Sequence, residues 1–469
     1  MIKLKEIIMH LDEGVFESLE RSFVKNKADN FLYLLKSYRN NKKDAEIIDT
    51  LNVNSNSFYV LKSRLFDKIQ EHLSGDIYVS KEELLKKLNT IPEICVKEPR
   101  EVATAFLKKL EKDLLQYDMH NELLIVYSAL KKLHLYSEKY FHYSQLFNKH
   151  IAFSLSLEKA EETLGNFNRV LGQYGFSRSA RYLETLKFLR KEVNDHYALN
   201  PSRQIEIIKS LIELQLCIFC NTDLNKEINV EEQLNQTEKI ILELPESSAH
   251  KTWLLVVHFL CFEYYYKINQ IKKALLHYEK VAAMQKQLLL YSNIGLTSKF
   301  FITKIAFMQQ QGKVNELAME DPKQVIFDKD DTHSKVLFTI YDSMVSYYCG
   351  NIREAANKLN TILNENSFKD LFHINADVKL TLAFYYIEMK EFEIADSIIK
   401  GIYRKIKSEK IDNYSNILDI IKVFEIEIKQ SGGNITDKQK DHFTLFTARN
   451  KKENEVLRHL IMEFENKYN

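Results

Sequence analysis

The chain has 469 residues, of which only 11 are glycine and 5 are proline. In ordinary proteins these two residues total ~12%, and their scarcity here excludes a β-sandwich, a β-propeller, a collagen-like chain and a glycine-dependent nucleotide-binding fold. Charged residues make up 28%, hydrophobic residues 45%, and the net charge is +1. We therefore expect a folded protein without the basic excess of a nucleic-acid binder.

The first residues, MIKLKEIIMHLDEGVF, carry acidic side chains where a secretory signal needs an apolar run. The longest strongly apolar stretch, Trp253 to Phe262, covers about ten residues, whereas a bilayer span needs ~20. The five cysteines are scattered and odd in number, which does not fit a disulfide framework. They are Cys95, Cys217, Cys220, Cys261 and Cys349. We expect reduced thiols, a cytoplasmic location and no membrane partner.

Helical periodicity governs almost the whole chain. In residues 122–135 the apolar side chains recur at the i, i+3, i+4 and i+7 spacing of a half-buried helix. The same spacing predicts helices near residues 12–25, 28–40, 56–73, 101–117, 203–220, 252–267 and 413–429. Strand-like alternation with turn pairs is missing. The predicted fold class is all-α.

Helix-stop signals divide the chain into four predicted parts. A small N-terminal helical domain ends at the Ser-Gly-Asp turn of residues 74–76, and Pro92 and Pro99 mark a further break. Helical hairpins that look like degenerate repeats come next, then clearer repeats, then helices that cap the last repeat. These parts are residues 1–76, 77–249, 250–412 and 413–469.

Four segments within residues 250–405 align with one another. Each has a small or apolar anchor early in its second helix, and the anchors lie 43, 38 and 40 residues apart. They are Ala274, Leu317, Ala355 and Ala395. The pattern resembles the tetratricopeptide repeat, although the interval exceeds 34 residues and the closing proline is absent. The resemblance implies a right-handed α-solenoid of antiparallel hairpins, with a generic helix bundle as the alternative.

The resemblance also implies a groove lined by the first helix of each hairpin. Tyrosines gather in pairs on these helices, and one ring of each pair is expected in the core while its neighbour turns about 100° toward the groove. The candidate groove residues are Tyr264, Tyr266, Tyr347, Tyr348 and Tyr385. Such a surface suits an extended or helical peptide. Packing of all these rings between helices is an equal alternative.

Residues 44–73 have the layout of a helix-turn-helix, with helices over 44–51 and 57–73. The side chains placed to reach a major groove are Asn56, Tyr59, Lys62 and Arg64. Against DNA binding, residues 1–76 hold 12 basic and 12 acidic side chains, and phosphate binding needs a basic excess. The other interpretation is a small domain that docks onto the repeats or onto a partner.

Two broader resemblances concern the whole layout and its start. A small helical domain followed by tetratricopeptide-like repeats resembles the architecture of peptide-sensing bacterial regulators of the Rap type. The stretches FLYLLKSY and VLKSRLFDKIQEHL resemble the start of uncharacterised proteins of the Bacteroidota. The first resemblance implies a regulator that senses a ligand through its repeats.

No catalytic, cofactor or metal motif stands out. Cys217 and Cys220 form C-x-x-C, but they lie in the apolar helix LIELQLCIFC and are expected in the core. Phosphate-loop, nucleophile-elbow and zinc-protease motifs are missing. The sequence thus predicts a non-enzymatic scaffold that binds a protein or peptide in its groove, without a cofactor. The alternative is a transcriptional or signalling regulator with an N-terminal helix-turn-helix.

Overall fold

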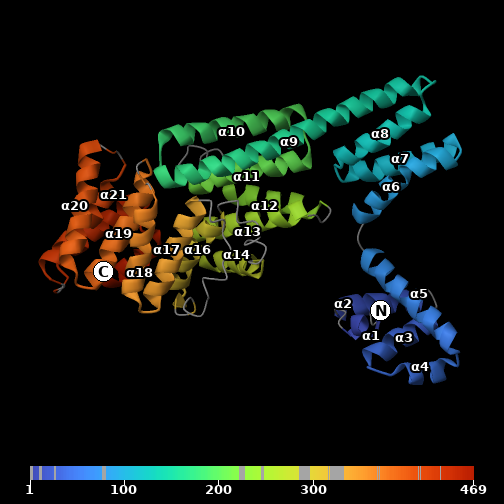
Figure 1. Cartoon of the computed structure of the whole chain (residues 1–469), viewed down its shortest axis with the longest axis horizontal. Coiled ribbons are helices and arrows are strands. Elements are labelled where there is room, and N and C mark those ends of the chain that lie inside the picture. Colours follow the sequence, from blue (N-terminus) through green and yellow to red (C-terminus); the bar gives the residue numbers. More distant parts are fainter. Residues whose placement is uncertain are drawn as a thin grey trace. The chain divides into compact units, whose positions relative to one another are not determined.

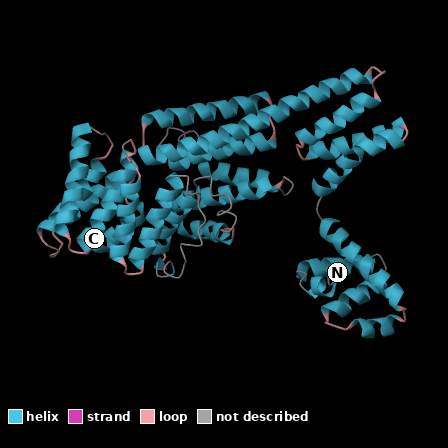
Figure 2. Cartoon of the chain, viewed as in Figure 1, coloured by secondary structure: helices cyan, strands magenta, loops and turns pink. Residues whose placement is uncertain are grey.

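The computed structural model describes residues 4–9, 13–25, 28–75, 81–220, 228–244, 248–284, 296–314, 316, 332–366, 368, 370–409, 411, 413–431, 433 and 435–468. Within these ranges every regular element is a helix (Figure 2), which confirms the predicted all-α class. The chain divides into two units, Met1–Phe147 and Asn148–Asn469. The boundary predicted at residue 76 lies outside the described residues.

The first unit consists of short helices and the beginning of a long one. They are α1 (Leu4–Met9), α2 (Glu13–Lys25), α3 (Asp29–Arg39), α4 (Asp44–Leu51), α5 (Ser55–Gly75), α6 (Lys81–Lys97), α7 (Arg100–Gln116), α8 (His120–Leu133) and the start of α9 (Lys139–Ser177). Two separate hydrophobic clusters hold them. One joins α1 to α5 around Leu34 and Leu65, and the other joins α6 to α9 around Leu107 and Leu123.

The break predicted around Pro92 is wrong, because α6 runs through this proline to Lys97. A proline inside a helix removes one backbone hydrogen bond and crowds the preceding turn. In α6 the neighbouring Leu88 and Ile91 are almost fully buried in the cluster with α7 and α8. Their burial outweighs the lost hydrogen bond, and the chain turns only at Pro99, directly before α7.

The second unit continues with α9 and then a series of helices that Figure 1 follows from green to red. They are α10 (Ala180–Leu199), α11 (Arg203–Phe219), α12 (Val230–Leu242), α13 (Ser248–Lys267), α14 (Ile271–Ala283), α16 (Leu296–Gln310), α17 (Thr332–Tyr348), α18 (Ile352–Glu365), α19 (Phe372–Glu388), α20 (Phe392–Glu409), α21 (Ser415–Lys429), α22 (Asp437–Asn450), the 3-10 turn η5 (Arg458–Leu460) and α23 (Ile461–Tyr468). Most helices that follow one another in the chain pack on each other, which is compatible with a helical repeat.

One turn recurs four times in this unit, after α13, α16, α17 and α19. Each copy has a residue with positive φ: Asn269 (60°), Gly312 (67°), Gly350 (82°) and Lys390 (61°). The N–H of the following residue donates to the carbonyl five residues earlier, at 2.8 or 2.9 Å, as in a Schellman motif. These positions recur at the intervals of the predicted anchors. The recurrence of this turn is compatible with a helical repeat, although the same turn also follows α3 and α7 in the first unit.

Small residues lie where the two helices of a hairpin meet. Ala274, Ala355 and Ala395, near the starts of α14, α18 and α20, are fully buried. A side chain without atoms beyond Cβ lets the helix approach its partner closely, which is the role that the sequence predicts for these anchors. The fourth anchor, Leu317, lies outside the described residues.

The end of the chain runs back over the repeats. Helix α22 packs on α21 and begins with a capping box made by Thr436 and Gln439. After Asn450 the chain reverses, and residues 456–468, which include η5 and α23, contact five helices farther back in the chain, α13, α16, α17, α19 and α21, as well as α22, from which they continue. We call residues 456–468 the return segment, and the sides of the five helices that it contacts the receiving face.

Candidate partner-binding site

The return segment makes a buried ion pair with α13. Arg458 Nη1 lies 3.0 Å from Glu263 Oε2, and the Glu263 side chain is only 2% exposed. The Glu263 carboxylate also accepts a hydrogen bond from Thr303 of α16. The Arg458 guanidinium lies 5.2 Å from the centroid of the Tyr266 ring, a cation–π distance. Charges removed from water are tolerated only when paired, so Glu263 and Arg458 depend on each other.

Helix α19 contacts Leu457 and His459, the two neighbours of Arg458 in the chain, through polar groups. The Leu457 N–H donates to Asp377 Oδ1 at 2.5 Å, and Leu457 has a φ of 56°, a strained left-handed conformation for leucine. His459 Nε2 lies 3.0 Å from Thr381 Oγ1. Burial lowers the pKa of His459 and raises that of Asp377. Both shifts favour neutral forms, so hydrogen bonding dominates this part of the receiving face.

Three large side chains anchor the rest of the segment, and the hydroxyl of the third, Tyr468, donates to Glu427 Oε2. Leu460, Phe464 and Tyr468 follow one another at intervals of four residues and are fully buried. The Phe464 ring centroid lies 5.1 Å from that of Phe384 on α19 and 5.8 Å from that of Phe424 on α21, both edge-to-face. This is the favoured geometry of aromatic pairs. Helix α23 thus places one apolar stripe against α19 and α21.

Charged and polar groups flank this stripe. Lys467 Nζ lies 2.5 Å from Glu388 Oε1 of α19 and 2.6 Å from Glu427 Oε1 of α21. On the other side, Gln309 Nε2 of α16 donates to Glu463 Oε1 at 3.3 Å. Burial raises the pKa of Glu463. The receiving face is therefore acidic at both ends, where it meets Arg458 and Lys467.

Three of the five predicted groove tyrosines lie beside the return segment. Tyr266 faces the Arg458 guanidinium. Tyr348 accepts a hydrogen bond from Gln309, and burial together with the nearby Glu463 raises the pKa of its hydroxyl. Burial and Glu463 raise the pKa of Tyr347 in the same way. The surface that the sequence assigned to a peptide partner is here covered by a segment of the chain itself.

The other two predicted tyrosines have different surroundings. Tyr385 is fully buried and donates to the Met344 sulfur at 3.1 Å, so it belongs to the core and offers nothing to a partner. Tyr264 packs edge-on against Tyr265, with ring centroids 5.3 Å apart. Burial raises the pKa of Tyr264, and charges on α12 and α14 act on it. Tyr264 and Tyr266 are two residues apart, which turns them about 200° away from each other around the helix.

Sequence reasoning missed the return segment. Its signal was present as the four-residue spacing of Leu460, Phe464 and Tyr468, which marks an apolar helix stripe. The sequence-based interpretation placed these residues in capping helices. The spacing identifies an amphipathic helix but does not say which surface the stripe covers, because that depends on residues far away in the sequence, such as Phe384 and Phe424.

In the first unit, the two predicted helices of the helix-turn-helix are present as α4 and α5. The turn between them begins with Asn52 at a φ of 49°. On α5, Asn56, Tyr59 and Arg64 are exposed, and Tyr59 is 61% exposed. These three side chains are accessible to a ligand.

Lys62, the fourth predicted DNA contact, is engaged within the unit. Its ammonium lies 2.9 Å from Asp44 Oδ2, and its side chain is 25% exposed. It also lies within 6 Å of three aromatic ring centroids, those of Tyr38, Phe58 and Tyr59. A phosphate would have to compete with the Asp44 carboxylate for this cation.

The C-x-x-C pair lies in the core, as predicted. Cys217 and Cys220 are almost fully buried in a cluster with α9 and α10. Burial raises the pKa of both thiols to about 11, which keeps them protonated at neutral pH. Protonated, buried thiols are poor nucleophiles and poor metal ligands.

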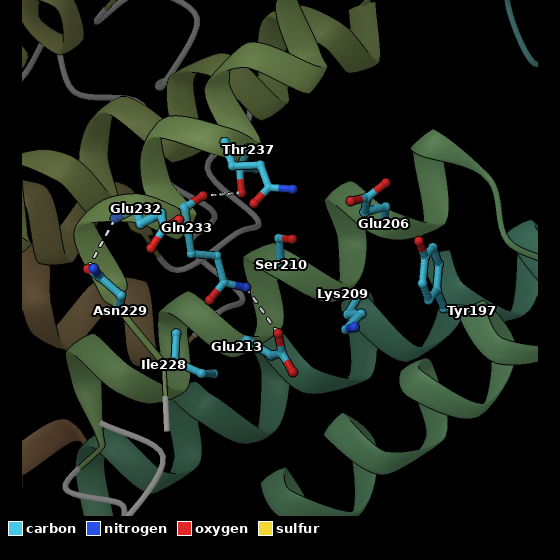
Figure 3. A pocket seen from close by; sticks show the side chains of 11 residues that line it. Tyr197, Glu206, Lys209, Ser210, Glu213, Ile228, Asn229, Glu232, Gln233 and Thr237 are labelled. Carbon is cyan, nitrogen blue, oxygen red and sulfur yellow. Dashed lines mark hydrogen bonds between the residues drawn. The ribbon is translucent and has the colours of Figure 1, made fainter. Parts of the chain in front are cut away.

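A hollow of about 290 Å³ lies between α10, α11 and α12 and is lined by several carboxylates (Figure 3). Glu213, the most buried of them, accepts hydrogen bonds from Gln233 Nε2 at 3.0 Å and from Arg190 Nε at 3.1 Å. Its oxygens are thus occupied. Among the described residues, no group of three or more His, Cys, Asp or Glu side chains is placed to bind a metal.

A second hollow, of about 470 Å³, lies between α18, α19 and α20. Its described lining residues include Lys379 and Lys405 and no carboxylate. Burial and the neighbouring Lys405 lower the pKa of Lys379. The two ammonium groups make the described lining of this hollow basic.

Comparisons of the chain with known protein families, curated proteins and solved structures found no match. In the described part of the chain, no helix is long and apolar enough to span a bilayer. The receiving face is therefore the feature from which a function can be inferred.

Proposed function

We propose that the chain is a non-enzymatic cytoplasmic scaffold that binds a protein or peptide partner through the receiving face. One observation carries the proposal: this face binds a helical segment along five helices by aromatic packing, ion pairs and a backbone hydrogen bond. Peptide-binding grooves use the same combination of apolar anchors and a few oriented polar groups. The proposal includes no cofactor and no reaction.

The finer architecture is part of this proposal. We infer a right-handed solenoid of tetratricopeptide-like hairpins, in which α13, α17 and α19 are first helices and α14, α18 and α20 are second helices. The recurring turns and the buried alanines support it. In such a solenoid the first helices line one continuous face, which is where the return segment lies.

A photoreactive side chain at matched tyrosine positions tests the proposal. The full chain carries a photoreactive phenylalanine analogue at Tyr347 on the receiving face, at Tyr403 on α20, or at Tyr59 on α5. Tyr403 is 45% exposed and Tyr59 is 61% exposed, so both controls are accessible. The chain is irradiated in native lysate, and adducts are identified by mass spectrometry.

We expect a protein adduct at position 347 that is absent at position 403. An adduct found only at position 403 contradicts the proposal, because the partner then binds outside the receiving face. Adducts only at position 59 favour the N-terminal unit as the binding element. A crosslink from position 347 to the return segment alone reports the resident contact and is scored separately from capture of a partner.

A regulator that binds DNA through α5 is the second candidate, because Asn56, Tyr59 and Arg64 are exposed after a short turn. If α5 binds DNA, substituting Lys62→Glu together with Arg64→Glu abolishes salt-dependent binding. Fluorescence anisotropy of labelled duplex DNA at low salt measures it. The absence of binding by the intact chain at low salt removes this candidate.

A further inference from the structure

We infer that the return segment is a resident ligand of the receiving face, and that the partner is a helical peptide segment with the same side-chain pattern, which replaces it. This inference rests on the proposed function and names the kind of partner that the receiving face binds. Three features of the structure carry it: the pattern of the anchors, the strain at Leu457 and the exposed connection before the segment.

The anchors define the partner's chemistry. The return segment presents three fully buried large side chains at four-residue spacing and a cation near each end, Arg458 and Lys467. The receiving face has complementary groups: aromatic rings in the middle, and Glu263, Glu388 and Glu427 at the ends. A partner that fits is therefore a short amphipathic helix with an aromatic stripe and basic ends.

The connection to α22 places a cost on the resident segment that a separate molecule does not bear. The chain reverses here, held by hydrogen bonds from Val456 N to Asn450 Oδ1 (3.0 Å) and from Asn416 Nδ2 to the Asn454 carbonyl (2.8 Å). Leu457 follows with its strained positive φ. A segment from another protein makes the same side-chain contacts without this reversal, so it can compete.

The covalent connection to α22, which we call the tether, instead favours the resident segment over a free peptide. A covalently linked segment has an effective concentration of ~mM at its site, so a free ligand at micromolar concentration binds the uncut chain only when its own affinity for the receiving face is higher than that of the resident segment. Lys451 and Lys452, in the turn after α22, are exposed. Cutting the chain between them removes the tether and leaves the contacts of residues 456–468 unchanged. The cut chain should then exchange its segment with added peptide.

The experiment uses the full chain with a protease recognition sequence inserted between Lys451 and Lys452, cut after folding. The probe is a fluorescent peptide of residues 454–468, and its binding is followed by anisotropy. After cutting and gel filtration, we expect the labelled peptide to bind about 100-fold more tightly than to the uncut chain, because the tether no longer competes. A Phe464→Ala peptide should not bind, whereas an Asn466→Ala peptide, changed at an exposed position, should bind normally.

A charge exchange provides specificity. A Lys467→Glu peptide places a carboxylate beside Glu388 and Glu427 and should lose binding to the cut chain. Cut chain with Glu388→Lys should recover binding of that peptide. In a second measurement without any cut, the full chain with Lys467→Glu should bind the labelled natural peptide, because its own segment is weakened. The full chain with Asn466→Ala should not bind it.

Two results overturn the inference. In the first, the cut chain would keep its own segment through gel filtration and take up no labelled peptide. In the second, the cut chain would lose its helical circular dichroism. Either result makes residues 456–468 a permanent part of the core. The peptide could also exchange while position 347 of the cut chain captures no protein in lysate. That result would support the return segment as a displaceable ligand and would contradict the proposed scaffold function.

Discussion

At the scale of single residues, the receiving face depends on charges that lie away from water. Glu263 and Arg458 are the clearest pair, since the carboxylate is almost fully buried and accepts a second hydrogen bond from Thr303. The net stability that such a pair contributes is small, because both ions are desolvated. The loss of one partner is costly, because the other charge stays buried alone.

We expect Arg458→Ala to lower the free energy of unfolding by about 3 kcal/mol, the lower end for a broken buried pair, since Arg458 is 26% exposed. The double variant Glu263→Gln with Arg458→Met should lose less than the single variant, because no unpaired charge remains. Urea unfolding followed by circular dichroism measures both. A double variant less stable than the single one would show that the two groups act independently.

Buried histidines give the stability a pH dependence. His258 on α13 is 7% exposed, and burial lowers its pKa to about 4, with Lys280 and His277 acting in the same direction and Glu238 against it. The folded chain keeps this ring neutral, whereas the unfolded chain protonates it below its ordinary pKa of ~6.5. Its contribution is therefore complete above pH 6.5 and is lost as the pH falls toward 4.

We expect the unfolding free energy to fall by up to about 3 kcal/mol between pH 7 and pH 4 on account of His258. Urea unfolding at several pH values measures this slope. His258→Gln should show a shallower slope, because glutamine does not titrate. Equal slopes in both proteins would mean that His258 is protonated in the folded chain.

At the scale of elements, the turns between helices carry the repeat. Gly350 has a φ of 82° between α17 and α18, and Gly401 lies inside helix α20. A Cβ atom added at either position meets no atom within 4 Å. The two glycines therefore differ in backbone conformation alone, which makes them a matched pair.

We expect Gly350→Ala to destabilise the chain by about 1 kcal/mol, because alanine is strained at positive φ. Gly401→Ala should stabilise it by about 0.5–1 kcal/mol, since alanine is the better helix former. Thermal or urea unfolding of both variants measures the sign of the change in stability for each substitution. Destabilisation by both substitutions would contradict the assignment of the strain to φ.

Element prediction from sequence succeeded where local chemistry decides. The periodicity around residues 122–135 and the glycine turn at Gly350 depend on residues that are close in sequence. The helix and the turn were therefore predicted to within a few residues. The break predicted at Pro92 was wrong, because burial of α6 against α7 and α8 outweighs the local preference of proline to end a helix. The partner of the Leu460–Tyr468 stripe could not be predicted, because the receiving face is assembled from five helices far apart in the sequence.

At the scale of the whole molecule, the chain has several separate hydrophobic clusters. The cluster of α1 to α5 contains Leu65, and the largest cluster, which extends from Phe176 to Tyr468, contains Ile420; both side chains are fully buried. Separate clusters open independently when few contacts connect them. A single free energy of unfolding is then insufficient to describe the chain.

We expect Leu65→Ala to cost 2–5 kcal/mol locally and to speed amide hydrogen exchange in α1 to α5. Exchange in α17 to α21 should stay unchanged. Ile420→Ala should give the reverse pattern. Hydrogen exchange with mass spectrometry reads both, and acceleration throughout the chain by either substitution would indicate one cooperative unit.

The ion pair between Glu263 and Arg458 joins residues 195 positions apart, which has a consequence for synthesis. At translation rates of about 5–20 residues per second, about 10–40 s pass between the emergence of these two residues. In the last part of that interval, after α21 has ended at Lys429, the growing chain carries all five helices of the receiving face but not yet the return segment. A partner or chaperone that binds cotranslationally thus meets an open face, before the chain's own segment exists to compete.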